Sequence, residues 1–141
     1  MAFGVPPSLK GFFAGDDAQD PDIFTLYANN INPNTATDLL WNGQGTVGPI
    51  TPTNYTLKIT VMEIVNLGSG TGKVQLNAQN TVAASSATIP QFEVYVAATS
   101  TQTFTTELFR ALAPPNCKFQ VVAATTCDVV ALARYIKGAG Q

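Results

Sequence analysis

Residues 54–61, NYTLKITV, decide the fold class of this chain. In this stretch Tyr55, Leu57, Ile59 and Val61 alternate with threonine and lysine. Because successive side chains of a strand point to opposite faces, a period of two places all four apolar side chains on one face. The stretch therefore predicts a half-buried β-strand that packs on a core.

The same alternation recurs toward the C-terminus, with turn residues between the segments. The segments are residues 74–78 (VQLNA), 92–96 (FEVYV), 102–109 (QTFTTELF), 117–123 (CKFQVVA) and 127–136 (CDVVALARYI). The last segment also fits a helix, with Asp128 near its start and Gly138 past its end. We favour a strand there, because every neighbouring segment is predicted to be one. The pattern predicts an all-β fold, an antiparallel, jelly-roll-like β-sandwich.

The N-terminal residues differ from the rest of the chain. Residues 1–15, MAFGVPPSLKGFFAG, are apolar but are interrupted by two prolines and three glycines, which excludes regular structure. We expect an extended arm over residues 1–15 and a single β-sandwich domain over residues 16–141. The apolar side chains of the arm are predicted to lie on its own sandwich or on a neighbouring subunit. The candidate partner-binding residues of the arm are Phe3, Val5, Leu9, Phe12 and Phe13.

Turn signals dominate residues 16–54. Asp20 and Pro21 fit the N-cap and first position of a short helix over residues 23–27, and a short strand is the alternative. The carboxylates of Asp16, Asp17, Asp20 and Asp22 are candidate calcium ligands, but their spacing is not that of an EF-hand. We favour a solvated turn and expect no bound metal.

The charge content indicates which classes of partner the chain can bind. Charged residues make up 11% of the sequence, against about 25% in ordinary soluble domains. Thr, Asn, Gln and Ser replace them, which favours a surface that packs against other surfaces. The net charge is −2 and the seven Lys and Arg are scattered, so we expect no direct binding to nucleic acid. No signal peptide or long apolar run is present, which predicts a protein made in a cytoplasm and no membrane contact.

The glycines of residues 66–76, NLGSGTGKVQL, resemble a phosphate-binding loop only superficially. Leu67 stands where that loop needs glycine, and Val74 stands where it needs Ser or Thr. The segment that follows has the periodicity of a strand, whereas a phosphate loop leads into a helix. We interpret these residues as the flexible tip of a β-hairpin.

Catalytic groups are few. The chain has no histidine, which removes the commonest general base and leaves too few ligands for structural zinc. Glu63 and Glu93 are a candidate glycosidase pair, but a single acid such as Glu63 more often marks a bulge, an edge or a subunit contact. Cys117 and Cys127 are predicted to be reduced core thiols, too far apart to bridge if their strands form a hairpin at residues 125–126. We expect a protein that is not an enzyme and has no cofactor.

Aromatic residues allow two interpretations. Trp41, Tyr27, Tyr55 and Tyr95 either line a sugar-binding groove or pack in the core with one interface anchor. We favour core packing with an anchor, and Trp41 joins the candidate partner-binding residues.

Taken together, these features resemble small β-sandwich virion proteins of tailed bacteriophages, notably capsid decoration (cement) proteins. The resemblance is carried by the strand pattern of residues 92–136, the arm MAFGVPPSLKG and the charge-poor composition. It implies a homotrimer or homodimer on the capsid outer surface of a virion, made in the host cytoplasm, that binds and stabilises the shell of major capsid protein. The alternatives are a tail, neck or fibre component, or a carbohydrate-binding module that uses Trp41.

Overall fold

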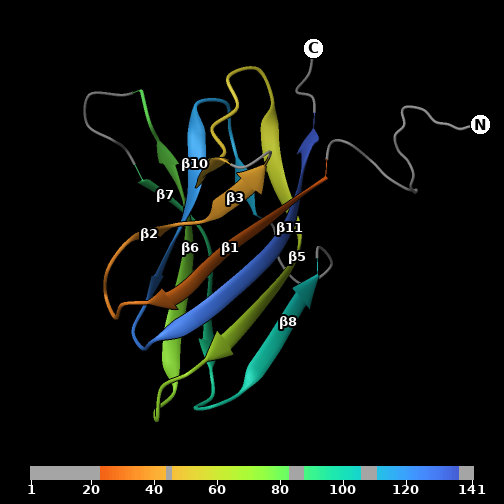
Figure 1. The fold of residues 1–141 in the computed structure, drawn as a ribbon. Coiled ribbons are helices and arrows are strands. Elements are labelled where there is room, and N and C mark those ends of the chain that lie inside the picture. Colours follow the sequence, from red (N-terminus) through yellow and green to blue (C-terminus); the bar gives the residue numbers. More distant parts are fainter. Residues whose placement is uncertain (1–22, 44–45, 83–87, 106–110, 137–141) are drawn as a thin grey trace, which may run out of the picture.

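Strands make up the regular structure of the molecule. The computed structural model describes residues 23–43, 46–82, 88–105 and 111–136, and these contain strands and no helix (Figure 1). In chain order the strands are β1 (Ile23–Ile31), β2 (Thr37–Asp38), β3 (Leu40–Gly43), β4 (Thr46–Pro49), β5 (Thr56–Asn66), β6 (Gly72–Asn80), β7 (Thr88–Val96), β8 (Thr101–Thr105), β9 (Leu112–Ala113), β10 (Cys117–Ala123) and β11 (Cys127–Ile136).

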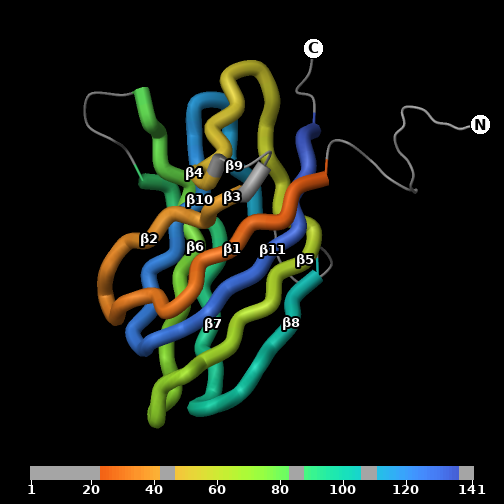
Figure 2. Tube along the Cα trace, viewed as in Figure 1, coloured from red at the N-terminus to blue at the C-terminus, as the bar shows by residue number. Residues whose placement is uncertain are grey.

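The strands form two sheets that lie face to face (Figure 2). The seven-stranded sheet has the order β4-β3-β1-β11-β5-β8, and β9 also pairs with β5. The four-stranded sheet has the order β2-β10-β6-β7. Every strand pairing in the described residues is antiparallel. The predicted all-β antiparallel sandwich is confirmed.

The path of the chain is that of a jelly roll. The connections β1–β2, β5–β6, β7–β8 and β10–β11 each pass from one sheet to the other. As a result, strands that are far apart in sequence become neighbours, such as β1 and β11. A jelly roll has eight strands in two sheets of four, and its chain crosses repeatedly between them. Here β1, β11, β5 and β8 form one set of four, and β2, β10, β6 and β7 form the other.

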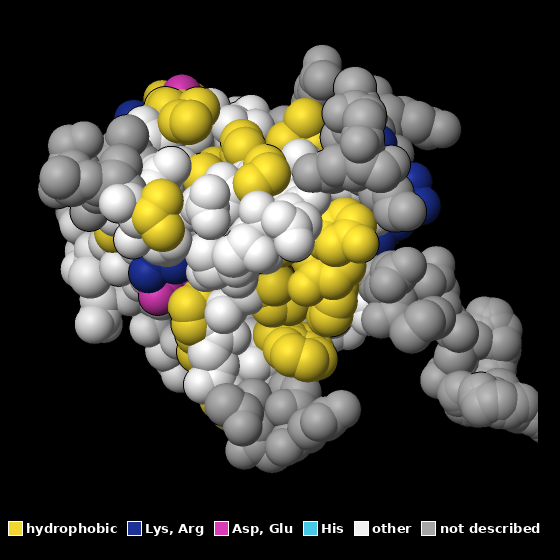
Figure 3. Space-filling model, turned by 90° about the horizontal axis from the view of Figure 1, so that it is seen from above, with side chains coloured by type: hydrophobic (Ala, Val, Ile, Leu, Met, Phe, Trp, Pro, Cys, Tyr) yellow, Lys and Arg dark blue, Asp and Glu magenta, His cyan; other side chains and the backbone are white. Residues whose placement is uncertain are grey.

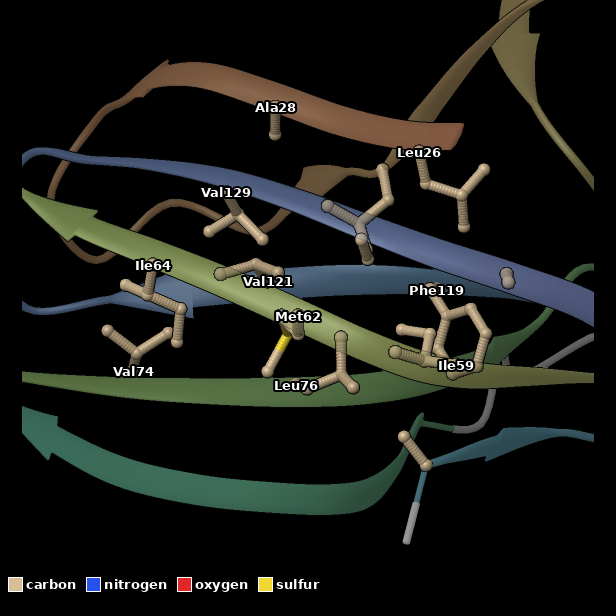
Figure 4. Close-up of a cluster of buried hydrophobic side chains, with 14 of the residues drawn as sticks. Leu26, Ala28, Ile59, Met62, Ile64, Val74, Leu76, Phe119, Val121 and Val129 are labelled. Atoms are coloured by element: carbon tan, nitrogen blue, oxygen red, sulfur yellow. The ribbon is translucent and has the colours of Figure 1, made fainter. Parts of the chain in front are cut away.

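The core lies between the two sheets. Side chains of β1, β5 and β11 meet those of β6 and β10 there (Figure 4). Inward-facing side chains of this kind contribute about 1.5–3 kcal/mol each when a Val, Leu, Ile or Phe is fully buried. The largest fully buried side chains are Phe119, Leu26, Ile31, Leu39, Leu57, Ile59, Met62, Ile64, Leu76, Val74, Val96 and Val121.

A β-bulge corrects the predicted orientation of β5. Leu57 and Ile59 face the core as predicted, but the register against β11 shifts so that Thr60 is the extra residue. The shift reverses the alternation, because a bulge places two residues opposite one. Val61, predicted to face the core, therefore points outward, and Met62 takes the buried position. Glu63 itself is paired in regular register with Val130, three residues beyond the bulge, so the interpretation of Glu63 as a bulge residue is wrong.

The first strand corrects another expectation. The helix predicted over residues 23–27 is wrong, and the alternative strand is right, since these residues belong to β1. Pairing of β1 with β11 overrides the local helix-start signals, and Leu26 and Ala28 become core residues. Strand formation by the final segment, β11, is confirmed.

Two connections predicted as hairpins are crossings between sheets. Residues 67–71 join β5 to β6, and residues 124–126 join β10 to β11, but neither pair of strands is hydrogen-bonded. The hairpin interpretation of the glycine-rich stretch is therefore wrong. The stretch is also held in place, because the buried side chain of Asn66 donates to Gly70 O and accepts from Gly68 N. Local sequence does not distinguish a hairpin from a crossing, because both need the same turn residues.

Candidate functional site

The outer face of the seven-stranded sheet carries an exposed apolar strip. We call the outward-pointing side chains of β1, β11, β5 and β8 the outer face. Ile23, Val130 and Leu132 are 50%, 40% and 39% exposed there. Strand register places Val130 between Tyr27 and Glu63, and it places Leu132 beside Val61. Contiguous apolar side chains on a sheet surface mark an interaction site more often than scattered ones do.

Charges on the outer face lie at its two ends. Lys58 on β5 is paired in register with Arg134 on β11. Toward the opposite end lie Glu63 and Asp128, of which Asp128 also accepts a hydrogen bond from the backbone N–H of Asn30 at 2.7 Å. The basic side chains therefore lie beside Ile23 at one end of the strip, and Glu63 lies beside Val130 toward the other end.

An aromatic cluster closes the sandwich at the end where β1 begins and β11 ends. Phe24 packs edge-on against Trp41 and Tyr135, with ring centroids 5.3 and 4.8 Å apart. Tyr55 stacks on Tyr135 at 5.3 Å. Figure 3 views the molecule from this end and shows hydrophobic side chains gathered in a broad patch, with few charged side chains. Tyr55 was predicted to face the core from a strand, but it precedes β5 and covers the end of the core instead.

The four aromatic residues considered for a sugar groove do not converge. Trp41 and Tyr55 belong to the end cluster, and Trp41 is half-buried against the core. Tyr27 lies on the outer face, and Tyr95 lies on the four-stranded sheet. Core packing of Trp41 is thus observed, and its role as a partner anchor stays a prediction. Phe3, Val5, Leu9, Phe12, Phe13 and the aspartates of residues 16–22 lie outside the described residues.

The exposed face of the four-stranded sheet is polar. Lys73 and Glu93 form an ion pair at 3.1 Å, and the hydrogen bond from Lys73 to Glu93 raises the pKa of the lysine. At the opposite edge, Asp38 accepts hydrogen bonds from Lys118 at 3.0 Å and from Gln120 at 2.8 Å. The two faces of the molecule therefore differ in character, because the outer face carries the exposed aliphatic side chains of Ile23, Val130 and Leu132 among its polar groups.

The two cysteines are buried and unbridged, as predicted. Burial raises the pKa of both thiols. They lie on different sheets, since Cys117 begins β10 and Cys127 begins β11. The predicted hairpin between β10 and β11 is wrong. The prediction that Cys117 and Cys127 form no disulfide is right.

The described residues offer little for catalysis. Glu63 and Glu93 lie on opposite sheets, which separates the candidate glycosidase pair. Within the described ranges, no group of three or more His, Cys, Asp or Glu residues is placed to hold a metal ion. The described part also has no helix of the length and apolarity needed to cross a membrane.

Comparisons with known proteins give structural likenesses but no family. No family model matches the chain, and no curated protein matches it. A crystal structure of the N-terminal endo-1,4-beta-D-xylanase 10B of Clostridium thermocellum, with CBM22-1 and GH10 modules and bound xylohexaose, is similar with a TM-score of 0.45 and 13% identity. The likeness covers 87% of this chain and 26% of that chain. No activity of that enzyme is carried over, because one fold hosts many functions.

The apolar strip of the outer face was not predicted from the sequence. A signal was present in residues 127–136, where Val130 and Leu132 occupy positions that should be polar on a half-buried strand. Val61 gave no signal, because its outward orientation depends on the bulge at Thr60.

Proposed function

We propose that this chain is a non-enzymatic virion structural protein, a capsid decoration protein that binds and stabilises the shell of major capsid protein. The outer face of the seven-stranded sheet is its main protein-contact surface. The observation that carries this proposal is the apolar strip of Ile23, Val130 and Leu132 on a sheet face that no other part of the described chain covers.

The physical reason is the cost of leaving this strip in water. Burial of apolar surface contributes about 25 cal/mol per Å², so an exposed strip gains free energy when another protein covers it. Lys58, Glu63, Asp128 and Arg134 also lie on this face, so a partner must offer them charged or polar groups to offset the cost of desolvation. A modest contact becomes stronger when one copy engages the shell through two linked sites, here the outer face and the arm, because the second contact forms at high effective concentration.

The arm is the second proposed contact. Phe3, Phe12 and Phe13 offer apolar side chains that a neighbouring subunit can cover. Deletion of residues 1–13 is expected to weaken particle binding and to leave the far-ultraviolet circular dichroism of the sandwich unchanged. Unchanged affinity of the truncated protein would remove the arm from the proposal.

Quantitative mass spectrometry of purified particles from the source of the chain tests the proposal. A decoration protein is expected in copy numbers comparable with those of the shell protein. A few copies per particle would support a tail, neck or fibre component instead, and absence from particles would reject a virion role.

Carbohydrate binding is the second candidate, and the position of Tyr95 favours it. This ring is 66% exposed on the four-stranded sheet, with Lys73 opposite and Glu93 two residues away on the same face. An exposed aromatic ring beside hydrogen-bonding side chains suits a sugar ring, which is apolar on its faces and polar at its edge. A glycan array with wild type, Tyr95→Ala and Trp41→Ala tests it, and absence of any glycan signal for wild type would reject it.

A further inference from the structure

We propose that the outer face of the seven-stranded sheet binds a second copy of this chain, with the two sheets face to face and their strands antiparallel. This inference rests on the function proposed above only in taking the outer face as the contact surface. It goes further, because it names the partner that covers this face in the free chain and the geometry of the contact. The second copy and the shell use the same face, so each copy binds one of them at a time.

The apolar strip supplies the centre of the interface. Val61 and Leu132 are paired in register, and Val130 and Tyr27 form the next pair along β11. All four point away from the core, because their sequence neighbours Met62, Leu26 and the alanines of β11 point into it. A central apolar patch with polar groups around it is the usual composition of a protein interface.

The charges determine the direction of the contact. On the described outward positions of β1, β5, β8 and β11 the only charged side chains are Lys58 and Arg134 at one end and Glu63 and Asp128 toward the other. If a second copy packed with its strands parallel, like charges would face each other. If the strands are reversed, the basic end of each copy lies over the acidic end of the other.

A two-fold axis satisfies this arrangement. The axis lies between the two sheets and runs across the strands, so that each strand stacks on its own copy with reversed direction. When the axis passes over the Val61–Leu132 pair, Lys58 of one copy lies over Glu63 of the other, because each is two register positions from that pair. The axis repeats the contact, so two such ion pairs form at once.

The size of the face suits a reversible dimer. β1, β5 and β11 are about 30–36 Å long and β8 is about 17 Å long, so at a spacing of about 4.8 Å the four strands present roughly 550 Å² per copy. The total for two copies is about 1,000–1,200 Å², which lies at the lower end of specific interfaces. Face-to-face sheets pack about 10 Å apart, a distance that a lysine and a glutamate span together.

Sedimentation velocity of the full chain over a concentration series tests the dimer. Wild type is expected to shift from monomer to dimer as its concentration rises, and Leu132→Glu is expected to remain a monomer. Ile89→Glu is the matched control, because Ile89 is a comparably exposed apolar residue on the other sheet. Its dimer is expected to match wild type. A wild type that is monomeric at every concentration, or that forms only trimers, would overturn the proposal.

Charge reversal tests the antiparallel geometry. Lys58→Glu and Glu63→Lys are each expected to raise the dimer dissociation constant by about tenfold, and the double variant to return it close to wild type. Circular dichroism and urea unfolding confirm that each variant is folded. A double variant that dimerises no better than the single variants would overturn the antiparallel arrangement.

Failure of this inference is distinguishable from failure of the proposed function. A dimer that is absent from purified particles supports the inference and rejects the virion role. A monomer found in particles in high copy number rejects the inference and supports the virion role.

Discussion

The hydroxyl of Thr125 donates a hydrogen bond of 2.9 Å to Oδ1 of Asn66, and this bond joins two of the connections that cross between the sheets. Asn66 ends β5, and Thr125 lies between β10 and β11. The amide of Asn66 also donates to the carbonyl oxygens of Gly70 and Val96, each at 2.9 Å, and its Oδ1 accepts from Gly68 N at 2.8 Å. One buried side chain therefore bonds to the β5–β6 connection, to the end of β7 where the β7–β8 connection starts, and to the β10–β11 connection.

Asn66→Ala is expected to lower the free energy of unfolding by about 2–4 kcal/mol, because it leaves several buried polar groups without partners. Urea denaturation measures the change. Asn32→Ala is the control, since Asn32 is exposed and is expected to change stability by less than about 0.5 kcal/mol. Equal effects of the two substitutions would show that the Asn66 network contributes nothing.

Gly72→Ala is expected to lower stability by about 1–3 kcal/mol, because the added Cβ would overlap the Thr125 hydroxyl. Gly70→Ala is the matched control, since a Cβ at Gly70 meets no atom within 4 Å. A double-mutant cycle with Thr125→Ala measures the overlap. The cost of Gly72→Ala is expected to fall in the Thr125→Ala background, and an unchanged cost would contradict the close approach.

Thr99→Asn is expected to raise stability by roughly 1 kcal/mol, because Thr99 has a φ of 49° and a β-branched residue is strained there. The other non-glycine residues with positive φ in the described chain are all asparagines: Asn30, Asn34 and Asn116. Thr101→Asn, at an exposed strand position, is expected to lower stability slightly. Thermal unfolding compares the two, and a gain at both positions would exclude relief of strain as the cause.

Buried thiols are expected to make the protein less stable in alkali. Burial raises the pKa of Cys117 and Cys127 above the ordinary value of 9.0, so both stay protonated in the folded state while they ionise in the unfolded state. Their contribution to stability is therefore fully present below the unfolded pKa and is lost as the pH rises toward the folded pKa. Urea unfolding at about pH 8 and about pH 10 measures the loss.

The Cys117→Ala/Cys127→Ala variant is the control for that pH dependence. It is expected to lose less stability than wild type over the same range, although it starts from a lower value. An identical pH dependence of wild type and variant would assign the loss to other groups.

Alternation of apolar and polar side chains predicted most of the strands, because burial of one sheet face makes every second residue of a strand apolar. The inward positions of β6 and β10, such as Leu76, Phe119 and Val121, follow from that alternation alone. The bulge at Thr60 does not, since one extra residue shifts every later side chain without a local signal. The outward position of Val61 was missed for that reason.

Long-range pairing was the other limit of sequence analysis. Asp20 and Pro21 are helix-start signals for residues 23–27, yet β1 forms because β11, about a hundred residues later, offers it a partner. The network of Asn66 was also missed, although an asparagine at a strand end before glycines is a known turn signal. Its partners Val96 and Thr125 lie far away in sequence.

Incorporation into particles measures most directly whether the outer face makes this chain a decoration protein. Particles assembled with wild type, Ile89→Glu or Leu132→Glu are purified, and mass spectrometry gives the ratio of this chain to the shell protein. Wild type and Ile89→Glu are expected at high, similar ratios, and Leu132→Glu at a ratio lower by about tenfold or more, because loss of the contact removes the gain from multiple engagement. Absence of wild type from particles, or equal incorporation of Leu132→Glu, would contradict the proposed function of the outer face.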